Sequence, residues 1–198
     1  MLLSMLLLFF FAVPSAKQTS NAPAADDGPA YTANGELKFP DRYREWVFLT
    51  SGIDMSYSAT ENPSHSRFDN VFVNPTAYRV FCETGTWPDK TVLILEIRGA
   101  EGAASINKRG HTQSMETMGL EVHVKDSSKS GWTFYDFKNE VSGRPFERTA
   151  DCYSCHQQHA AVDTTFVQFY PTLLGKAKEK GTLSAEYLKE MSSQEKGK

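Results

Sequence analysis

The most specific chemical signal in the sequence is the run Cys-Tyr-Ser-Cys-His at residues 152–156. Two thiols three residues apart on one helical turn can form thioether bonds with the two vinyl groups along one edge of a porphyrin, and the adjacent His156 can then present Nε2 to the iron. Its other ring nitrogen needs an acceptor that fixes the tautomer, typically a backbone carbonyl. The spacing therefore predicts a covalently bound haem c, with Cys152 and Cys155 as its anchors and His156 as the ligand of the iron.

Other uses of this cysteine pair fit the chain less well. A thioredoxin-like pair would begin a helix inside a β-α-β unit, and no such pattern surrounds Cys152. A zinc site with Cys152, Cys155 and His159 has no evident fourth ligand, because Cys82 lies far earlier in the chain. A disulfide between Cys152 and Cys155 would be strained. Cys82 itself is expected to be a small buried apolar side chain, with a redox or interchain role as the alternative.

The second axial position of the iron decides between two kinds of haem function. A Met or His ligand there makes an electron carrier, whereas an open apolar pocket binds small gases. His159 lies one turn after His156 on the same helix, so it cannot reach the opposite face of the haem. The sequence leaves six candidate ligands, of which none stands out: Met55, Met115, Met118, Met191, His65 and His111.

The composition is that of an ordinary globular chain. It has 198 residues, 21 basic and 24 acidic side chains, a formal net charge of −3, 40% hydrophobic residues and 12% aromatic residues. This length suits one folded domain, and the apolar share argues against disorder along the whole chain. The near-neutral charge argues against nucleic-acid binding, which needs a basic face.

The first residues are typical of an export signal. Residues 1–13 form an apolar run that is broken only by Ser4 and is shorter than the about 20 residues of a membrane-spanning helix. With small residues at 15 and 16, this run predicts a signal peptide over 1–16 and a periplasmic protein, and a retained N-terminal anchor is the alternative. We expect a flexible linker over 17–34, the haem c domain over 35–180, and a C-terminal helix with a charged tail over 181–198.

Short β-branched and aromatic runs predict strands at residues 46–49, 71–73, 91–98, 118–125 and 132–137. A helix is expected between the second and third run, with Asn74 as its cap, Pro75 in its first turn and Gly85 at its end. The pattern becomes helical again after Pro145. This order predicts an α+β fold with a mainly antiparallel sheet and a few helices, and with the haem motif on a C-terminal helix.

Alternation along residues 116–125 sorts two candidate side chains. The apolar residues at 118, 120, 122 and 124 share one face, so His123 on the other face is expected to point to solvent rather than to a ligand. Glu116 has the phase of the apolar set. If the strand includes it, its carboxylate points inward and is a candidate catalytic group. If the strand begins after it, the carboxylate reaches water.

Longer blocks of sequence lie around and before the haem motif. They are Phe-Asp-Asn-Val-Phe-Val-Asn-Pro at 68–75, Ala-Tyr-Arg at 77–79, Thr-Gly-Thr-Trp-Pro-Asp at 84–89, Cys-His-Gln-Gln-His-Ala-Ala-Val-Asp at 155–163 and Phe-Val-Gln-Phe-Tyr-Pro at 166–171. Together with Tyr-Arg-Glu-Trp at 43–46, these blocks resemble the cytochrome P-460 family, which includes cytochrome c′-β. The resemblance covers roughly residues 36–175.

The resemblance implies a homodimer with a large antiparallel sheet and one haem c per chain, with His156 as the only protein axial ligand of its iron. The family has two functional types. Cytochrome P-460 proper oxidises hydroxylamine, and a lysine from a sheet strand is bonded to its porphyrin. Cytochrome c′-β lacks that bond, and its crowded apolar distal side binds nitric oxide or carbon monoxide.

This chain departs from the enzyme type at the lysine, which the resemblance aligns at or near Leu95. The strand at 91–98 contains no lysine, and its inward phase reads Leu93, Leu95 and Ile97. Lys90 and Lys108 are the nearby substitutes, and both are expected to be solvated loop charges.

We therefore expect a five-coordinate iron that binds nitric oxide, carbon monoxide or a related small ligand, with Phe68 and Leu95 as apolar contacts in the distal pocket. Glu116 is the candidate polar group there, in the place of a distal carboxylate that accepts protons in the enzyme type. The alternatives are a hydroxylamine-oxidising enzyme that passes electrons to a partner cytochrome, and a simple electron-transfer cytochrome c.

Overall fold

The structure is a computed structural model that describes residues 26–57, 65–129, 131–137 and 141–196. The expected signal peptide and the first part of the expected linker lie outside the described residues. Within the described part, no helix is both long enough and apolar enough to cross a membrane.

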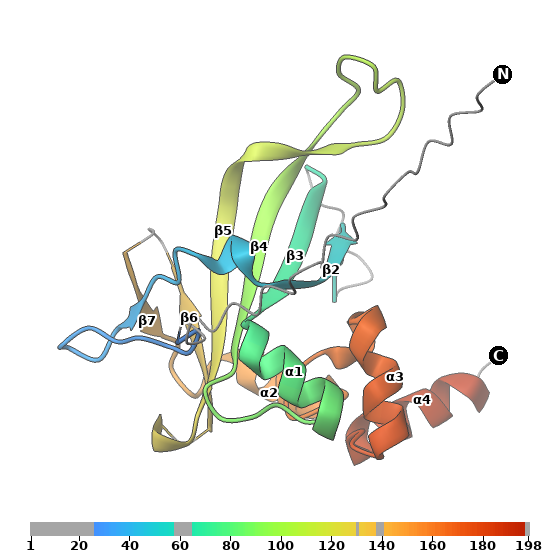
Figure 1. The fold of residues 1–198 in the computed structure, drawn as a ribbon. Coiled ribbons are helices and arrows are strands. Elements are labelled where there is room, and N and C mark those ends of the chain that lie inside the picture. The colour runs from blue at the N-terminus through green and yellow to red at the C-terminus, as the bar shows by residue number, and fades with distance from the viewer. Residues whose placement is uncertain (1–25, 58–64, 130, 138–140, 197–198) are drawn as a thin grey trace, which may run out of the picture.

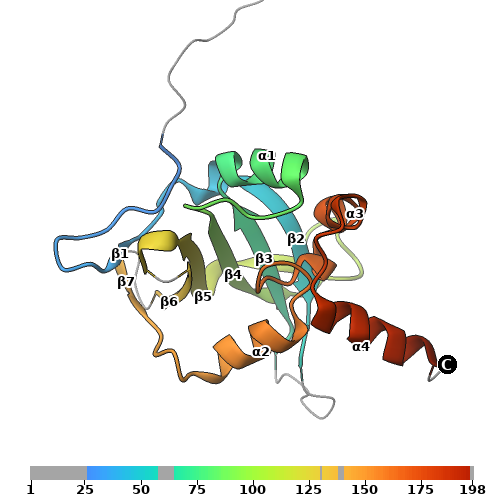
Figure 2. The ribbon, with the colours of Figure 1, turned by 90° about the horizontal axis from the view of Figure 1, so that it is seen from below.

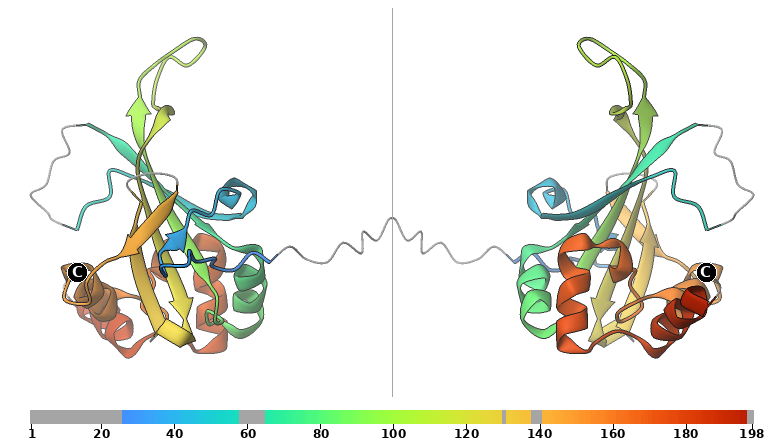
Figure 3. Two further views of the ribbon diagram at one scale, coloured as in Figure 1. Left: turned by 90° about the vertical axis from the view of Figure 1, so that its left-hand side faces the viewer. Right: turned by 90° about the vertical axis from the view of Figure 1, so that its right-hand side faces the viewer.

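The core of the fold is a seven-stranded sheet in which every neighbouring pair is antiparallel. Its order is β1-β7-β6-β5-β4-β3-β2. The strands are β1 (Leu37–Lys38), β2 (Val47–Ile53), β3 (Arg67–Val73), β4 (Val92–Glu101), β5 (Thr112–Asp126), β6 (Gly131–Asp136) and β7 (Ser142–Pro145). The hairpin of β4 and β5 projects beyond the rest of the domain (Figure 1; Figure 3).

Within the described residues, four helices accompany the sheet, which confirms the predicted α+β class. They are α1 (Pro75–Thr84), α2 (Asp151–His159), α3 (Pro171–Lys180) and α4 (Ala185–Lys196), with short 3-10 turns η1 (Tyr43–Glu45), η2 (Ser127–Lys129) and η3 (Val167–Phe169). Seen from below, α2 lies alongside the strands and α4 extends away from the sheet (Figure 2). The haem motif thus lies on a helix that follows all seven strands.

Helix α1 begins and ends where the sequence predicts, but its cap differs. Gly85 adopts a left-handed conformation (φ 78°), and its N–H donates to the Phe81 carbonyl. The side chain of Asn74 makes no capping hydrogen bond, because its Oδ1 accepts from the Val92 N–H at 2.8 Å instead. The N–H of Thr76, which has no partner within the helix, donates to an Asp27 carboxylate oxygen. A residue of the expected linker therefore caps the helix in place of Asn74.

Both faces of the sheet are covered by apolar cores. One core joins the sheet to all four helices, and it includes Val73 and Leu93 of the strands and Phe81 of α1. The other core lies on the opposite face beneath the N-terminal segment, and it includes Ile94 and Val122. Successive residues of β4 and β5 therefore alternate between two interiors rather than between an interior and solvent.

Candidate haem-binding site

A cavity of about 410 Å³ lies between the sheet and the segment that contains α2. Strands β2 to β5 form one side, and α2 and the chain around η3 form the other. Cys152, Cys155 and His156 all line the cavity, and the three cysteines of the chain are free thiols. One helical turn therefore presents the complete motif to a single cavity.

The orientation of His156 is set by a backbone carbonyl, at the place where the sequence predicts an acceptor. Its Nδ1 lies 2.8 Å from the carbonyl oxygen of Thr164. A carbonyl can only accept, so Nδ1 carries the proton and donates, and Nε2 retains its lone pair. Burial lowers the pKa of His156, which keeps the imidazole neutral. A neutral ring with a free Nε2 is the form that ligates iron.

Aromatic rings hold the imidazole of His156 on several sides. Phe166 stacks on it with ring centroids 4.2 Å apart, and Phe134 lies at 4.8 Å. Tyr153, from the same helical turn as the cysteines, stacks on Phe134 at 4.4 Å and accepts a hydrogen bond from its N–H. This packing fixes the ring plane as well as the tautomer.

The expectation that His123 faces solvent is wrong. His123 lines the cavity, and its ring contacts the His156 ring edge-on at 4.9 Å. Burial lowers the pKa of His123 well below its usual value, and the nearby His156 lowers it further. The apolar residues Leu120, Val122 and Val124 face the opposite core, so the polar phase of β5 points to the helices.

The sheet side of the cavity combines an apolar wall with a polar group that the sequence does not single out. The apolar residues include Val71, Leu93, Leu95 and Ile97. Glu121 also lines the cavity and lies directly across the β4–β5 ladder from Leu95. Burial raises the pKa of Glu121, and the charges of Asp136 and Asp69 raise it further.

Two of the expected distal residues lie elsewhere. Glu116 is in β5 but is exposed, and it does not line the cavity. Ile97 and Arg98 are adjacent in β4, but their partners in β5 are Gly119 and Thr117, so Met118 forms a bulge. The alternation of β5 side chains therefore changes phase at Met118, and Glu116 does not share the face of Leu120. Phe68 alternates along β3 with the cavity-lining residues at 67 and 69, which directs it to the other face.

Of the six candidate sixth ligands, Met55 lines the cavity. Met115 and Met118 are 93% and 60% exposed on the projecting hairpin. No lysine lines the cavity within the described residues. Lys90 pairs with Asp126 at 2.9 Å, and Lys108 donates to a loop carbonyl.

Residues 40–167 of the chain match the family model of cytochrome P-460. The chain belongs to the cytochrome P-460 family. The matched range includes the whole cysteine–histidine motif and strands β2 to β7, so the family assignment rests on most of the domain. No curated protein matches the chain at a significant level.

Membership of the cytochrome P-460 family makes the chain a c-type haem protein, and its residues fit that cofactor. Two free thiols, a neutral imidazole with Nε2 unprotonated, and a largely apolar cavity are the donor set and surroundings that a thioether-bound haem requires. Zinc gains no such support, because the described residues contain no cluster of three or more His, Cys, Asp or Glu side chains that could hold a metal ion.

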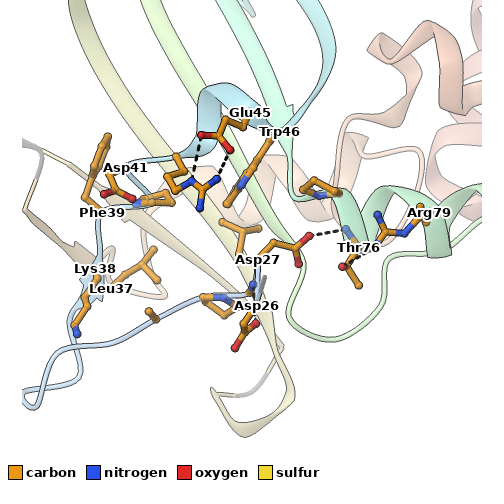
Figure 4. A pocket seen from close by; sticks show the side chains of 17 residues that line it. Asp26, Asp27, Leu37, Lys38, Phe39, Asp41, Glu45, Trp46, Thr76 and Arg79 are labelled. Atoms are coloured by element: carbon orange, nitrogen blue, oxygen red, sulfur yellow. Dashed lines mark hydrogen bonds and ion pairs between the residues drawn. The ribbon is translucent and has the colours of Figure 1, made fainter. Parts of the chain in front are cut away.

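A second cavity, of about 390 Å³, lies between the N-terminal segment, η1 and the start of α1 (Figure 4). Three of its charged groups have partners: Arg42 pairs with Glu45, and Asp27 accepts from the Thr76 N–H. Its described lining contains neither Cys nor His. The chain therefore offers its haem-binding side chains in the first cavity.

Proposed function

We propose that the chain is an exported monohaem protein whose iron, five-coordinate on His156, binds nitric oxide or a related small ligand. The observation that carries the proposal is the apolar wall from β3 and β4, together with the absence of lysine from the described lining. The apolar side chains of this wall exclude water and cannot themselves ligate the iron. The chain thus resembles cytochrome c′-β more than the hydroxylamine-oxidising type.

The residues of the site have separate tasks in this proposal. Cys152 and Cys155 would anchor the haem through thioethers, and Thr164 holds His156 in the ligating tautomer. The aromatic rings around His156 keep it from rotating, and the leucines of β4 keep water out. When bound, the haem supplies an iron with one axial position open to a small ligand.

Glu121 favours a second candidate function, the oxidation of hydroxylamine with transfer of electrons to a partner cytochrome. That oxidation releases protons as well as electrons, so the enzyme needs a proton acceptor at the substrate. Glu121 lies in the cavity, and its raised pKa brings it closer to neutral pH. Steady-state oxidation of hydroxylamine with an artificial acceptor, lost in Glu121→Gln, would establish this function over ligand binding alone.

Optical spectra of the purified haem protein test the first proposal. We expect a high-spin ferrous form that binds carbon monoxide and nitric oxide, and an ordinary haem c spectrum after denaturation in alkaline pyridine. A strongly red-shifted ferrous Soret band that survives denaturation would reveal a further bond to the porphyrin and favour the enzyme. A ferrous form that fails to bind carbon monoxide would indicate a sixth protein ligand.

Met55→Leu identifies that sixth ligand if one is present. Met55 lines the cavity, whereas Met118 is exposed, so Met118→Leu is the matched control. A low-spin wild-type iron that becomes high-spin in Met55→Leu alone would overturn the ligand-binding proposal and establish an electron carrier. An unchanged high-spin spectrum in both variants supports the open site.

Export and dimerisation complete the proposal. The apolar run at residues 1–13 supports export, which N-terminal sequencing of the periplasmic protein would test. The projecting hairpin and the edge strand β2 expose apolar side chains, including Ile106, Met115 and Phe48, and these support a homodimer. Sedimentation at several concentrations should give twice the chain mass, and a monomer at all concentrations would contradict this expectation.

A further inference from the structure

We propose that Lys125 and Asp163 form a positioning pair, which holds the carbonyl of Thr164 against His156 and thereby sets the electron donation of this ligand to the iron. The inference rests on the proposed role of His156 as the axial ligand.

The carbonyl that orients His156 belongs to a tight two-residue turn. The N–H of Thr165 donates to the Val162 carbonyl at 2.8 Å, and the reciprocal hydrogen bond is 3.3 Å long. The two residues between them, Asp163 and Thr164, both adopt left-handed conformations, with φ of 50° and 58°. Turns of this shape favour Asn-Gly, and a β-branched residue such as Thr is strained there. Such a conformation persists only where surrounding contacts hold it.

Strand β5 and the loop before β4 supply those contacts. Lys125 Nζ pairs with the Asp163 carboxylate and also donates to the Trp87 carbonyl at 2.7 Å. The Trp87 Nε1–H donates to Thr165 Oγ1 at 2.7 Å, which secures the other end of the turn. The Lys125 and Asp163 side chains are only 26% and 30% exposed, so solvent screens this pair less than a surface pair.

The position of the turn controls a hydrogen bond at the iron ligand. A shorter bond from His156 Nδ1 to the Thr164 carbonyl gives the ring more imidazolate character, and Nε2 then donates more strongly. Lys125 is on the same face of β5 as His123, whose ring contacts His156. One strand therefore fixes both the flank of the imidazole and, through Asp163, its hydrogen-bond acceptor.

The test uses the holoprotein and the iron–histidine stretching band of its ferrous form, measured by resonance Raman spectroscopy. Asp163→Asn removes the charge but keeps a residue that tolerates the left-handed conformation, and Lys125→Met removes the ammonium group. We expect both variants to move the band to lower frequency, and the double variant to move it no further than the larger single shift. Lys125→Arg keeps a positive charge opposite Asp163, so its band should stay close to the wild-type frequency. The midpoint potential should rise in the double variant, in which the two lost charges cancel.

Two control variants separate positioning from general stability. Lys90→Met breaks the ion pair with Asp126, also on β5, and should lower the melting temperature without moving the band. Thr164→Gly keeps the carbonyl, suits the left-handed conformation and removes a hydroxyl that has no partner among the described residues. It should leave the band in place and not lower the melting temperature.

A purely structural ion pair would give a different result. Asp163→Asn and Lys125→Met would then lower the melting temperature and leave the iron–histidine band at the wild-type frequency, which would overturn the inference. If the wild-type ferrous iron proves six-coordinate, the five-coordinate proposal fails separately. The Nδ1 proton of His156 then reports the hydrogen bond by NMR of the diamagnetic ferrous protein, and an unchanged shift in both variants overturns the inference.

Discussion

Glu121 is a carboxyl group placed against the apolar wall of the haem cavity, across the sheet from Leu95. Burial raises its pKa, Asp136 and Asp69 add to the shift, and Arg67 opposes it. Burial also raises the pKa of Asp69, which lines the same cavity. Both carboxyl groups therefore retain protons at pH values at which exposed ones are ionised, and they can store a proton beside a bound ligand.

We expect Glu121→Gln to raise the melting temperature at neutral pH. The pKa of Glu121 is higher in the folded chain than in the unfolded chain, so the ionised group opposes folding once the pH exceeds the unfolded pKa of about 4.3. The gain should therefore disappear below that pH. Glu116→Gln, the same change at an exposed position of β5, should leave the melting temperature unchanged throughout. An equal gain for Glu121→Gln at both pH values would contradict the argument, because ionisation would then have no part in it.

Local chemistry predicts helix α1 well and the hydrogen-bond partners of its ends poorly. Pro75 and Gly85 restrict or permit backbone angles by their own structure, so the sequence alone locates both ends of the helix. The use of Asn74 depends instead on β4, and the capping group comes from Asp27. These contacts join segments far apart in the chain, and no local pattern contains them.

The glycines that follow α1 and α3 have similar backbone conformations but different surroundings, so the same substitution should have different effects at the two positions. Gly85 and Gly181 both adopt left-handed conformations, with φ of 78° and 67°. A Cβ at Gly181 would meet nothing within 4 Å, whereas a Cβ at Gly85 would lie 2.7 Å from Lys180 Cβ and 2.9 Å from Thr182 Oγ1. We expect Gly181→Ala to cost about 1 kcal/mol in the free energy of unfolding, and Gly85→Ala roughly 2–4 kcal/mol. Chemical denaturation measures both, and equal losses would show that α3 moves to admit the methyl group.

The alternation of side chains along β5 predicts the strand but not the surroundings of its two faces. Its period of two is plain in the sequence and correctly predicts a strand. Alternation separates two faces but does not say what covers each one, and here both faces are covered. Glu121, His123 and Lys125 therefore point toward the cavity and the turn beside it, although their phase is typical of a solvent-facing set. The bulge at Met118 also has no local sequence signal, so the exposed position of Glu116 could not be predicted from alternation.

The haem motif is predictable from the sequence because its residues are contiguous and their spacing follows from porphyrin chemistry. The remainder of the site is assembled from four strands, α2 and the chain after it. The acceptor for His156 could be expected in kind, as a backbone carbonyl, but not in position. Its position depends on a left-handed turn and on an ion pair to a distant strand.

The sheet separates two apolar cores, and we expect them to respond differently to loss of the haem. The core on the N-terminal side, with Ile94 and Val122, contains no residue of α2. In a haem-free Cys152→Ser/Cys155→Ser chain, the side chains that line the cavity of about 410 Å³ beside α2 would lack packing partners. We expect a lower melting temperature and fast hydrogen exchange in α2 and residues 160–170, with slow exchange retained in the paired centre of β4 and β5.

Hydrogen–deuterium exchange with mass spectrometry on the holoprotein and the double variant measures this difference by segment. Cys152→Ser alone keeps one thioether, so it should retain haem and near-native protection, and it isolates the effect of the substitution itself. Fast exchange throughout the haem-free chain would mean that the sheet folds only around the cofactor, in the manner of small metal-dependent domains. Undiminished protection in α2 would mean that contacts of Tyr153 with Phe134, rather than the haem, hold the motif helix against the sheet.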